Sequence, residues 1–206
     1  MRIDHVAFAV GDLEEAAGRF RREYGLDSTP GGRHPGWGTA NRIVPLGEAY
    51  LELVAAVDEG AASRSVFGRA VLERAAAGGG WAAICVAPDD LDSVASRLGL
   101  EVVEGRRERP DGSRVRWRSA GVEDERRAPW MPFFIAWDIE TTEHPGRLRA
   151  GHGSRVEGIA RVEVGGDAAA LRDWLGGASL PLVVVPGPPG IRAVALATAG
   201  DELVIA

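Results

Sequence analysis

Two side chains in the first quarter of the chain have the types and the placement to do chemistry together. His5 lies in the alternating apolar segment IDHVAFAV, and Glu52 lies in a second apolar segment, YLELV. A carboxylate among apolar neighbours needs a partner, because burying it charged and unpaired is costly. If the two segments are neighbouring strands, the imidazole and the carboxylate converge. Glu52 is then a candidate general base and His5 a candidate ligand contact; the alternatives are an arginine pair for Glu52 and a hydrogen-bonded core histidine.

A glycine-rich segment, TPGGRHPGWGTAN, lies between these two candidates. It carries His34, Trp37, Thr39 and Asn41 among closely spaced glycines and prolines. Such a segment is a poor core element, but it brings backbone and ring side chains close to a small ligand. We therefore expect His34 and Trp37 to line a binding site, with hydrogen bonds from Thr39 and Asn41 to an oxygen-rich ligand. The alternative is that the His-Pro and Trp-Gly pairs only pack turns.

Two later strand patterns add binding candidates. Arg114, Arg116 and Arg118 alternate on one face of a strand, which forms an anion site if it lines a cleft and a solvated face if it meets water. The segment WMPFFIAWD is an aromatic strand pattern. We expect most of its rings to pack in the core, and Trp130 and Phe134 are candidates to line a pocket.

The remaining candidates favour structural roles. Cys85, the only cysteine, excludes an intramolecular disulfide and a cysteine-rich zinc site. It lies in the apolar run AAICV, which indicates a small buried hydrophobe more than a nucleophile. His144 and His152 lie in a long connection, where we expect surface turns.

Composition narrows the class of protein. The chain has 206 residues, of which 45% are hydrophobic and 26% charged, as in an ordinary globular protein. Its formal net charge of -6 argues against a general binder of nucleic acid or anionic membranes. All 24 basic residues are arginine, which excludes lysine chemistry. The chain opens directly on a strand pattern and has no apolar run near the roughly 18 residues of a membrane span, so we expect a cytoplasmic protein.

The elements that must position these residues follow a repeated order. Three segments, IDHVAFAVGDLEEAAGRF, WAAICVAPDDLDSVASRL and IARVEVGGDAAALRDWL, each pair a strand pattern with an acidic cap and an amphipathic helix. We predict an α+β fold in which repeated βαβββ modules form curved mixed sheets with helices outside and a concave cleft. The predicted parts are module one over 1–58, a helical connector over 59–80, module two over 81–138, a linker over 139–155 and a third, shorter βαβββ-like module over 156–206.

Three local expectations bear on the site. Strict alternation in the first strand places Ile3 on the same face as His5, and Asp4 on the opposite face. Residues 27–39 are expected to form a loop, and residues 63–77 a single helix.

These features resemble a known group of proteins. The repeated modules are similar to the vicinal oxygen chelate superfamily, which includes glyoxalase I, extradiol dioxygenases and fosfomycin- and bleomycin-resistance proteins. The run GGRHPGWGTAN followed by YLEL, PFFIAW and HPG resembles the glyoxalase-like domain family, over the whole chain. The resemblance implies a divalent metal (Zn, Fe, Mn or Ni) in the cleft, bound by a His of an opening strand and a Glu of a closing strand. His5 and Glu52 match those two positions.

Module two departs from that pattern, with Ala82 or Ala83 at the histidine position and Ile135-Ala136 at the carboxylate position. A metal site then needs His34 or a partner chain to add a ligand. Two functions remain open. One is lyase, isomerase or dioxygenase chemistry on a small oxygenated metabolite, metal-assisted or with Glu52 as a metal-free base. The other is a metal-free protein that binds or sequesters a small molecule. The superfamily's pairing of modules between chains also leaves a homodimer open.

Overall fold

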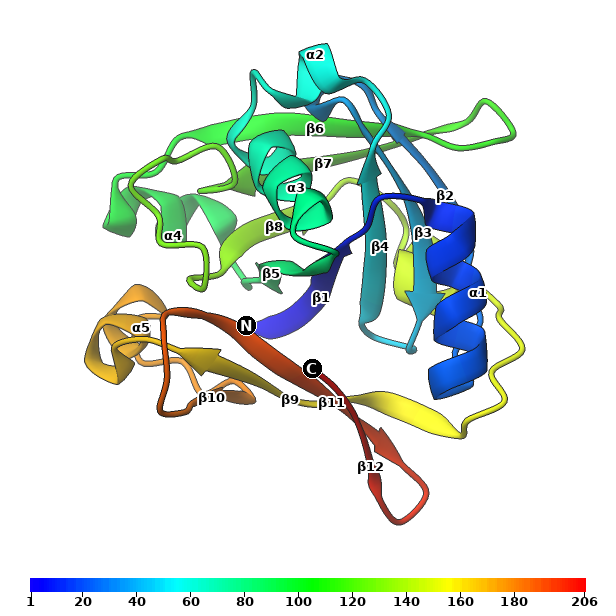
Figure 1. Ribbon diagram of the computed structural model, residues 1–206. Helices are drawn as coiled ribbons and strands as arrows, with labels where there is room; N and C mark the ends of the chain where they lie inside the picture. Colours follow the sequence, from blue (N-terminus) through cyan, green and yellow to red (C-terminus); the bar gives the residue numbers. More distant parts are fainter.

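The computed structural model describes residues 1–206 and shows a closed barrel with a smaller sheet beside it (Figure 1). The barrel strands are β1 (Arg2–Ala9), β2 (Thr29–His34), β3 (Thr39–Pro45), β4 (Tyr50–Ala56), β5 (Gly80–Ala87), β6 (Val102–Glu108), β7 (Arg114–Ala120) and β8 (Phe133–Trp137). Their order around the barrel is β1-β4-β3-β2-β6-β7-β8-β5. The predicted α+β class with repeated modules is confirmed, and the concave sheet closes on itself.

Each half of the barrel is one βαβββ module. In both halves the first strand pairs in parallel with the fourth, as β1 with β4 and β5 with β8. The halves join along a long antiparallel pairing of β1 with β5, and along a single pair between β2 and β6, Arg33 with Glu108. The helices are α1 (Leu13–Tyr24), α2 (Glu59–Ala62), α3 (Val66–Ala76) and α4 (Leu91–Leu98). No helix in the structure has the length and apolar character needed to cross a membrane.

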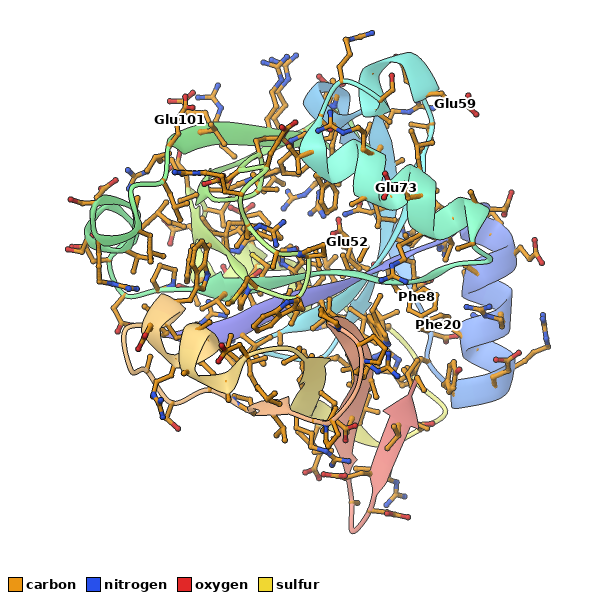
Figure 2. All side chains as sticks on the ribbon, turned by 60° about the vertical axis from the view of Figure 1, so that its left-hand side comes forward. Phe8, Phe20, Glu52, Glu59, Glu73 and Glu101 are labelled. Atoms are coloured by element: carbon orange, nitrogen blue, oxygen red, sulfur yellow. The ribbon has the colours of Figure 1, made fainter.

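The alternation of β1 divides the core into an outer and an inner layer. Val6 and Phe8 point outward to the larger cluster, where Phe8 meets Phe20 of α1 edge-on at 5.3 Å between ring centroids. Ala7 and Ala9 point inward to a smaller cluster inside the barrel. Figure 2 shows Phe8 and Phe20 beside α1, and Glu52 in the middle of the barrel. The small inner residues leave the interior open for larger side chains from other strands.

The C-terminal quarter forms a separate sheet that covers the outside of the barrel. Its elements are β9 (Val156–Gly165), α5 (Ala168–Trp174), β10 (Leu182–Val184), β11 (Gly190–Thr198) and β12 (Glu202–Ile205), in the order β10-β9-β11-β12. Trp81 of the barrel donates a hydrogen bond from Nε1 to the carbonyl of Ile205 at 3.1 Å. This segment has the same order of elements along the chain as the barrel modules, one strand, one helix and three strands. Its strands are arranged in a different order in the sheet, so its topology differs.

Two sequence expectations for module one and the connector are corrected. The expected loop over residues 27–39 contains β2, the strand that completes the module, and the short 3-10 helix η1 (Pro35–Trp37). Glycine and proline weaken the strand signal, because glycine marks close backbone approach as well as turns. The helix expected over residues 63–77 begins later, at Val66, because Ser65 accepts the N–H of Gly68 and caps α3, and the short helix α2 precedes it.

Candidate active site

A β-bulge in β1 turns two neighbouring side chains toward one network. The register of β1 against β5 shifts between Ile3 and His5, which leaves Asp4 as the extra residue. Ile3 packs in the outer core, whereas Asp4 is fully buried and bonds to the ring of His5. The expectation that Ile3 shares the face of His5, with Asp4 opposite, is therefore wrong, because a bulge breaks strict alternation.

The carboxylate of Asp4 accepts three hydrogen bonds. Its Oδ1 lies 2.7 Å from Nδ1 of His5, and its Oδ2 lies 2.9 Å from Nε1 of Trp137 and 3.0 Å from Nε2 of His144. Burial by itself raises the pKa of Asp4, but the hydrogen bonds from His144 and His5 outweigh it and hold that pKa well below its usual range. Asp4 is therefore ionised. Since the carboxylate can only accept, the neutral tautomer of His5 has its proton on Nδ1 and its lone pair on Nε2.

The sequence His-Pro-Gly occurs twice, and each copy delivers a buried histidine. His34 precedes η1, and His144 precedes the 3-10 helix η3 (Pro145–Arg147), which follows η2 (Thr141–Glu143) in the linker. Nδ1 of His144 accepts the N–H of Gly146 at 3.1 Å, so its proton lies on Nε2 and points to Asp4. The surface turn expected for His144 is wrong, since the residue is 5% exposed. His152 holds the linker to the barrel, with Nε2 2.8 Å from the carbonyl of Pro45.

Glu52 reaches the interior from β4 between two histidines. Its Oε2 lies 3.8 Å from Nε2 of His5, and its Oε1 lies 3.9 Å from Nε2 of His34. The amide of Asn41 donates to Oε1. Asn41 Nδ2 also lies 3.5 Å from His34 Nε2, and Thr39 Oγ1 lies 3.0 Å from His34 Nδ1, so we assign the proton to Nδ1. Burial lowers the pKa of His34 to about 4, which leaves its ring neutral at pH 7.

Two glycines of the segment before His34 make room for this arrangement. A Cβ on Gly31 would lie 2.0 Å from Oδ1 of Asn41, and a Cβ on Gly32 would lie 2.2 Å from the carbonyl oxygen of Glu108. The same Cβ on Gly32 would lie 2.8 Å from Cγ of Arg107. Gly32 also has a φ of +148°, which favours glycine. The glycine pair therefore allows the side chains of Asn41 and Arg107 to lie against the backbone of β2.

These side chains surround a cavity of about 20 Å³ inside the barrel. Trp37, Trp117 and Trp137 line this cavity and also a groove of about 900 Å³ at the surface. Trp117 lies 5.9 Å from Trp37 and 5.5 Å from Trp137 between ring centroids, so the three rings form an aromatic wall between cavity and groove. The full lining of the cavity is His5, His34, Trp37, Asn41, Tyr50, Glu52, Phe67, Arg107, Trp117, Phe133, Ile135 and Trp137.

The donor atoms at the cavity fit a divalent cation. His5, His34 and Glu52 present two unprotonated ring nitrogens and a carboxylate from three strands, the set that suits iron, zinc and related metals. The second nitrogen of each ring is held by Asp4 or Thr39, as is usual for metal-binding histidines. The two separations involve different oxygens of Glu52, Oε2 with His5 at 3.8 Å and Oε1 with His34 at 3.9 Å. Binding of one metal therefore requires the carboxylate and the two rings to draw together.

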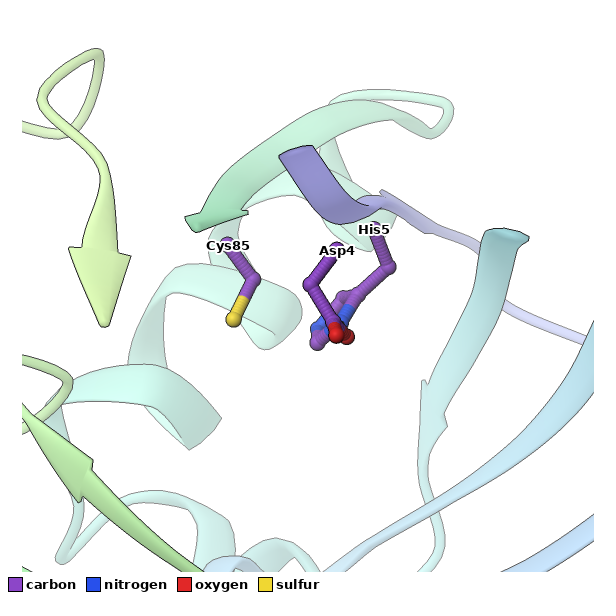
Figure 3. A group of neighbouring side chains, drawn as sticks. All are labelled: Asp4, His5 and Cys85. Carbon is purple, nitrogen blue, oxygen red and sulfur yellow. The ribbon is translucent and has the colours of Figure 1, made fainter. Parts of the chain in front are cut away.

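A second group of metal-type atoms lies on β1 and β5. Ligand atoms of Asp4, His5 and Cys85 lie within 4.8 Å of one another (Figure 3). Three donors already occupy the two oxygens of Asp4. Burial raises the pKa of the Cys85 thiol well above its usual value and keeps it protonated. This group fits a hydrogen-bonded core rather than a metal site, in line with the buried role expected for Cys85.

The structure brings together most of the residues that the sequence singled out. His34, Trp37 and Asn41 line the cavity with His5 and Glu52. Thr39 lies behind His34 and contacts its ring nitrogen.

Three predicted binding residues lie outside the cavity. Arg116 is exposed and lines the surface groove. Trp130 and Phe134 belong to the outer core, where Phe134 stacks on Trp174 of α5 and Trp130 packs against Gly166. They support the C-terminal sheet and line neither the cavity nor the surface groove.

Sequence reasoning missed several residues of the site. Asp4 was assigned to the wrong face because the bulge has no sequence signal. Arg107 is one of five arginines between residues 106 and 116, and nothing in the sequence marks it as the buried one. Tyr50, which stacks on His5 at 4.5 Å, lies in the segment YLELV, where nothing marks it as a site residue. Trp117 lies between the arginines of β7 and Trp137 within WMPFFIAWD, so neither stands out in the sequence.

A model of the glyoxalase-like domain family matches residues 3–177. This chain belongs to that family. The match includes every residue of the cavity and confirms the resemblance drawn from GGRHPGWGTAN, YLEL and HPG. No curated protein matches the sequence of this glyoxalase-like protein significantly.

One solved structure shares the fold over nearly the whole chain. A hypothetical protein from Staphylococcus aureus is 18% identical, covering 98% of this chain and 84% of its own, with a TM-score of 0.66. That coverage includes the C-terminal sheet. Two methylmalonyl-CoA epimerases cover about two thirds of this chain. The one from Mycobacterium tuberculosis is 22% identical, covering 66% of this chain and 86% of its own, with a TM-score of 0.46. The one from Streptomyces coelicolor, in complex with 2-nitronate-propionyl-CoA, is 20% identical, covering 68% and 99%, with a TM-score of 0.49.

Proposed function

We propose that this protein is an enzyme that isomerises or cleaves a small metabolite with oxygens on adjacent carbons, with a divalent metal held by His5, His34 and Glu52. The observation that carries this proposal is the convergence of two unprotonated Nε2 atoms and one carboxylate in a buried cavity. A metal bound there would polarise the adjacent oxygens and stabilise the negative charge that forms when a neighbouring C–H bond loses its proton.

The protein's own groups prepare the three ligands. Asp4 fixes the His5 ring through Nδ1, and Thr39 contacts the corresponding nitrogen of His34. The low pKa of His34, about 4, keeps its lone pair available near neutral pH. Each ring therefore presents a lone pair to the cavity without a change of tautomer.

Glu52 is also placed to move a proton. Asn41 donates to Oε1, whereas Oε2 accepts no hydrogen bond and faces His5 across 3.8 Å. A free carboxylate oxygen in a largely apolar cavity is a suitable general base. In the absence of a metal, Oε2 is the oxygen that would remove the proton, with Oε1 held in place by Asn41.

A substrate reaches the cavity from the surface groove by displacing a tryptophan. The cavity of about 20 Å³ holds about one water molecule, so the rings must move for a metabolite to enter. Trp117 is 4% exposed, whereas Trp37 is half-buried and lies in η1 between Gly36 and Gly38. No atom lies within 4 Å of a Cβ built on Gly36, which shows free space beside this turn. We assign the opening movement to Trp37.

Hydrogen exchange tests the proposed chemistry. The protein is stripped with EDTA, reloaded with Zn²⁺, Mn²⁺, Ni²⁺ or Fe²⁺, and incubated in D₂O with small 2-oxo and 2-hydroxy compounds. The expected result is loss of the proton NMR signal of a C–H beside the carbonyl, dependent on the metal and abolished in Glu52→Gln. Metal-independent ligand binding with no exchange in any mixture would contradict an enzymatic role.

One observation favours a second function, a metal-free binding protein. Module two lines the cavity with Phe133 and Ile135 and offers no charged or imidazole ligand from β5 or β8. The hydrogen bond from Asn41 also satisfies Glu52 in part without a metal. In that case ligands would raise the melting temperature of the EDTA-treated protein as much as that of the metal-loaded protein.

A further inference from the structure

Arg107 is a buried cation without a partner. It is 2% exposed, it makes no hydrogen bond or ion pair in the structure, and its Nε is buried and unpaired. By contrast, the half-buried Arg127 donates to the carbonyl oxygens of Gly121 and Met131. Burial lowers the pKa of Arg107 from its usual value, because a buried charge without a counter-ion is unfavourable. A buried charged group without a partner is typical of a binding site.

Arg107 faces the interior from β6, and its neighbour on β7 is also a donor without an acceptor. Trp117 pairs with Gly105, two residues before Arg107, and a Cβ on Gly105 would lie 2.2 Å from Nε1 of Trp117. That Nε1 is buried and has no hydrogen-bond partner. The β6–β7 side of the cavity therefore presents donors. The opposite side presents the acceptors of His5 and Glu52.

We propose that Arg107 binds the carboxylate of the substrate, so that the substrate is a small 2-oxo or 2-hydroxy acid. This inference rests on the proposed function, because it names the substrate class of the same cavity. A guanidinium matches a planar carboxylate with two parallel hydrogen bonds. A phosphate needs more room and more donors than the narrow cavity provides.

The donors and acceptors of the cavity fix the orientation of such an acid. With its carboxylate on Arg107, its adjacent oxygen is directed to the side of His5 and Glu52.

The test compares acids with their uncharged amides. The metal-loaded protein is titrated with glycolate, lactate or pyruvate, and with glycolamide, lactamide or pyruvamide, at constant ionic strength, and binding is followed by thermal shift and calorimetry. We expect the acids to bind and the amides not to bind. In Arg107→Met the affinity for acids is expected to fall at least about tenfold. Arg107→Lys keeps the charge but loses the two parallel N–H donors, so its affinity for acids is expected to lie between those of Arg107→Met and the wild type. Arg22→Met, which removes an exposed arginine of α1, is the matched control and should bind as the wild type does.

The outcomes separate this inference from the proposed function. Equal binding of acids by Arg107→Met and wild type, equal binding of acids and amides, or no binding of any acid would overturn the role of Arg107. Binding of inorganic phosphate in place of the acids, lost in Arg107→Met, would overturn the carboxylate assignment. If the acids bind through Arg107 but no metal binds, the inference stands and the metal-dependent function fails. If metal is bound through His5 and Glu52 but acids bind equally well without Arg107, the metal-dependent function stands and the inference about Arg107 fails.

Discussion

Replacing Arg107 by methionine is expected to stabilise the ligand-free protein. The guanidinium is 2% exposed and has no hydrogen-bond or ion-pair partner, so folding removes its hydration without replacement. An uncompensated buried charge costs about 3–5 kcal/mol, judged from buried pairs that lose one partner. Attraction to Glu52, which raises the pKa of Arg107, offsets part of this unfavourable free energy. Methionine keeps most of the apolar stem that packs against Gly32.

We therefore expect a net gain of about 1–3 kcal/mol in the free energy of unfolding for Arg107→Met. For a chain of this length, each kcal/mol raises the melting temperature by about 2–4 °C. Urea unfolding and calorimetry of the EDTA-treated protein measure the change, with Arg22→Met as the exposed control. A loss of stability of similar size would refute the reasoning, because it would show that Arg107 already has an effective counter-ion in the free protein.

Three further perturbations test the network around the cavity. Asp4→Asn replaces an acceptor of three hydrogen bonds by a group that must donate, and should lower stability by about 2–4 kcal/mol in urea unfolding and weaken metal binding about 10- to 100-fold. In the metal-free protein, His34 binds a proton at about pH 4 when folded and at 6.5 when unfolded. The free energy of unfolding is therefore unaffected by this group above pH 6.5, and it should fall by about 1.4 kcal/mol per pH unit between pH 6.5 and 4. This slope should be absent from His34→Gln. Gly31→Ala should cost about 1–3 kcal/mol by displacing the amide of Asn41, whereas Gly36→Ala, with no atom within 4 Å of the new Cβ, should be nearly neutral.

Local sequence signals predicted the regular elements well. The segment WAAICVAPDDLDSVASRL, expected to pair a strand with an acidic cap and a helix, forms β5, the cap Asp90 and α4. The segment IDHVAFAVGDLEEAAGRF likewise forms β1, the cap Asp12 and α1. Such elements depend on caps and periodicity, which a short window of sequence contains.

The parts that prediction missed depend on contacts between distant segments. β2 is a strand because β3 and β6 pair with it, although its own residues are mostly glycine, proline and polar groups. The bulge at Asp4 becomes visible only against β5, and its carboxylate is satisfied by Trp137 and His144, more than a hundred residues away. The identity of the one buried arginine among several likewise follows from the direction in which β6 faces. Residue types thus predicted the candidate ligands, and tertiary pairing decided which groups support them.

Metal content is the most direct test of the central claim that His5, His34 and Glu52 form a metal site. The purified protein is dialysed against a mixture of divalent metals and analysed by mass spectrometry, beside His5→Ala, His34→Ala, Glu52→Gln and Cys85→Ser. The account predicts about one divalent metal per chain in the wild type and in Cys85→Ser, and its loss in the other three variants. A wild type without metal, or a metal that is retained in His34→Ala and lost in Cys85→Ser, would contradict it.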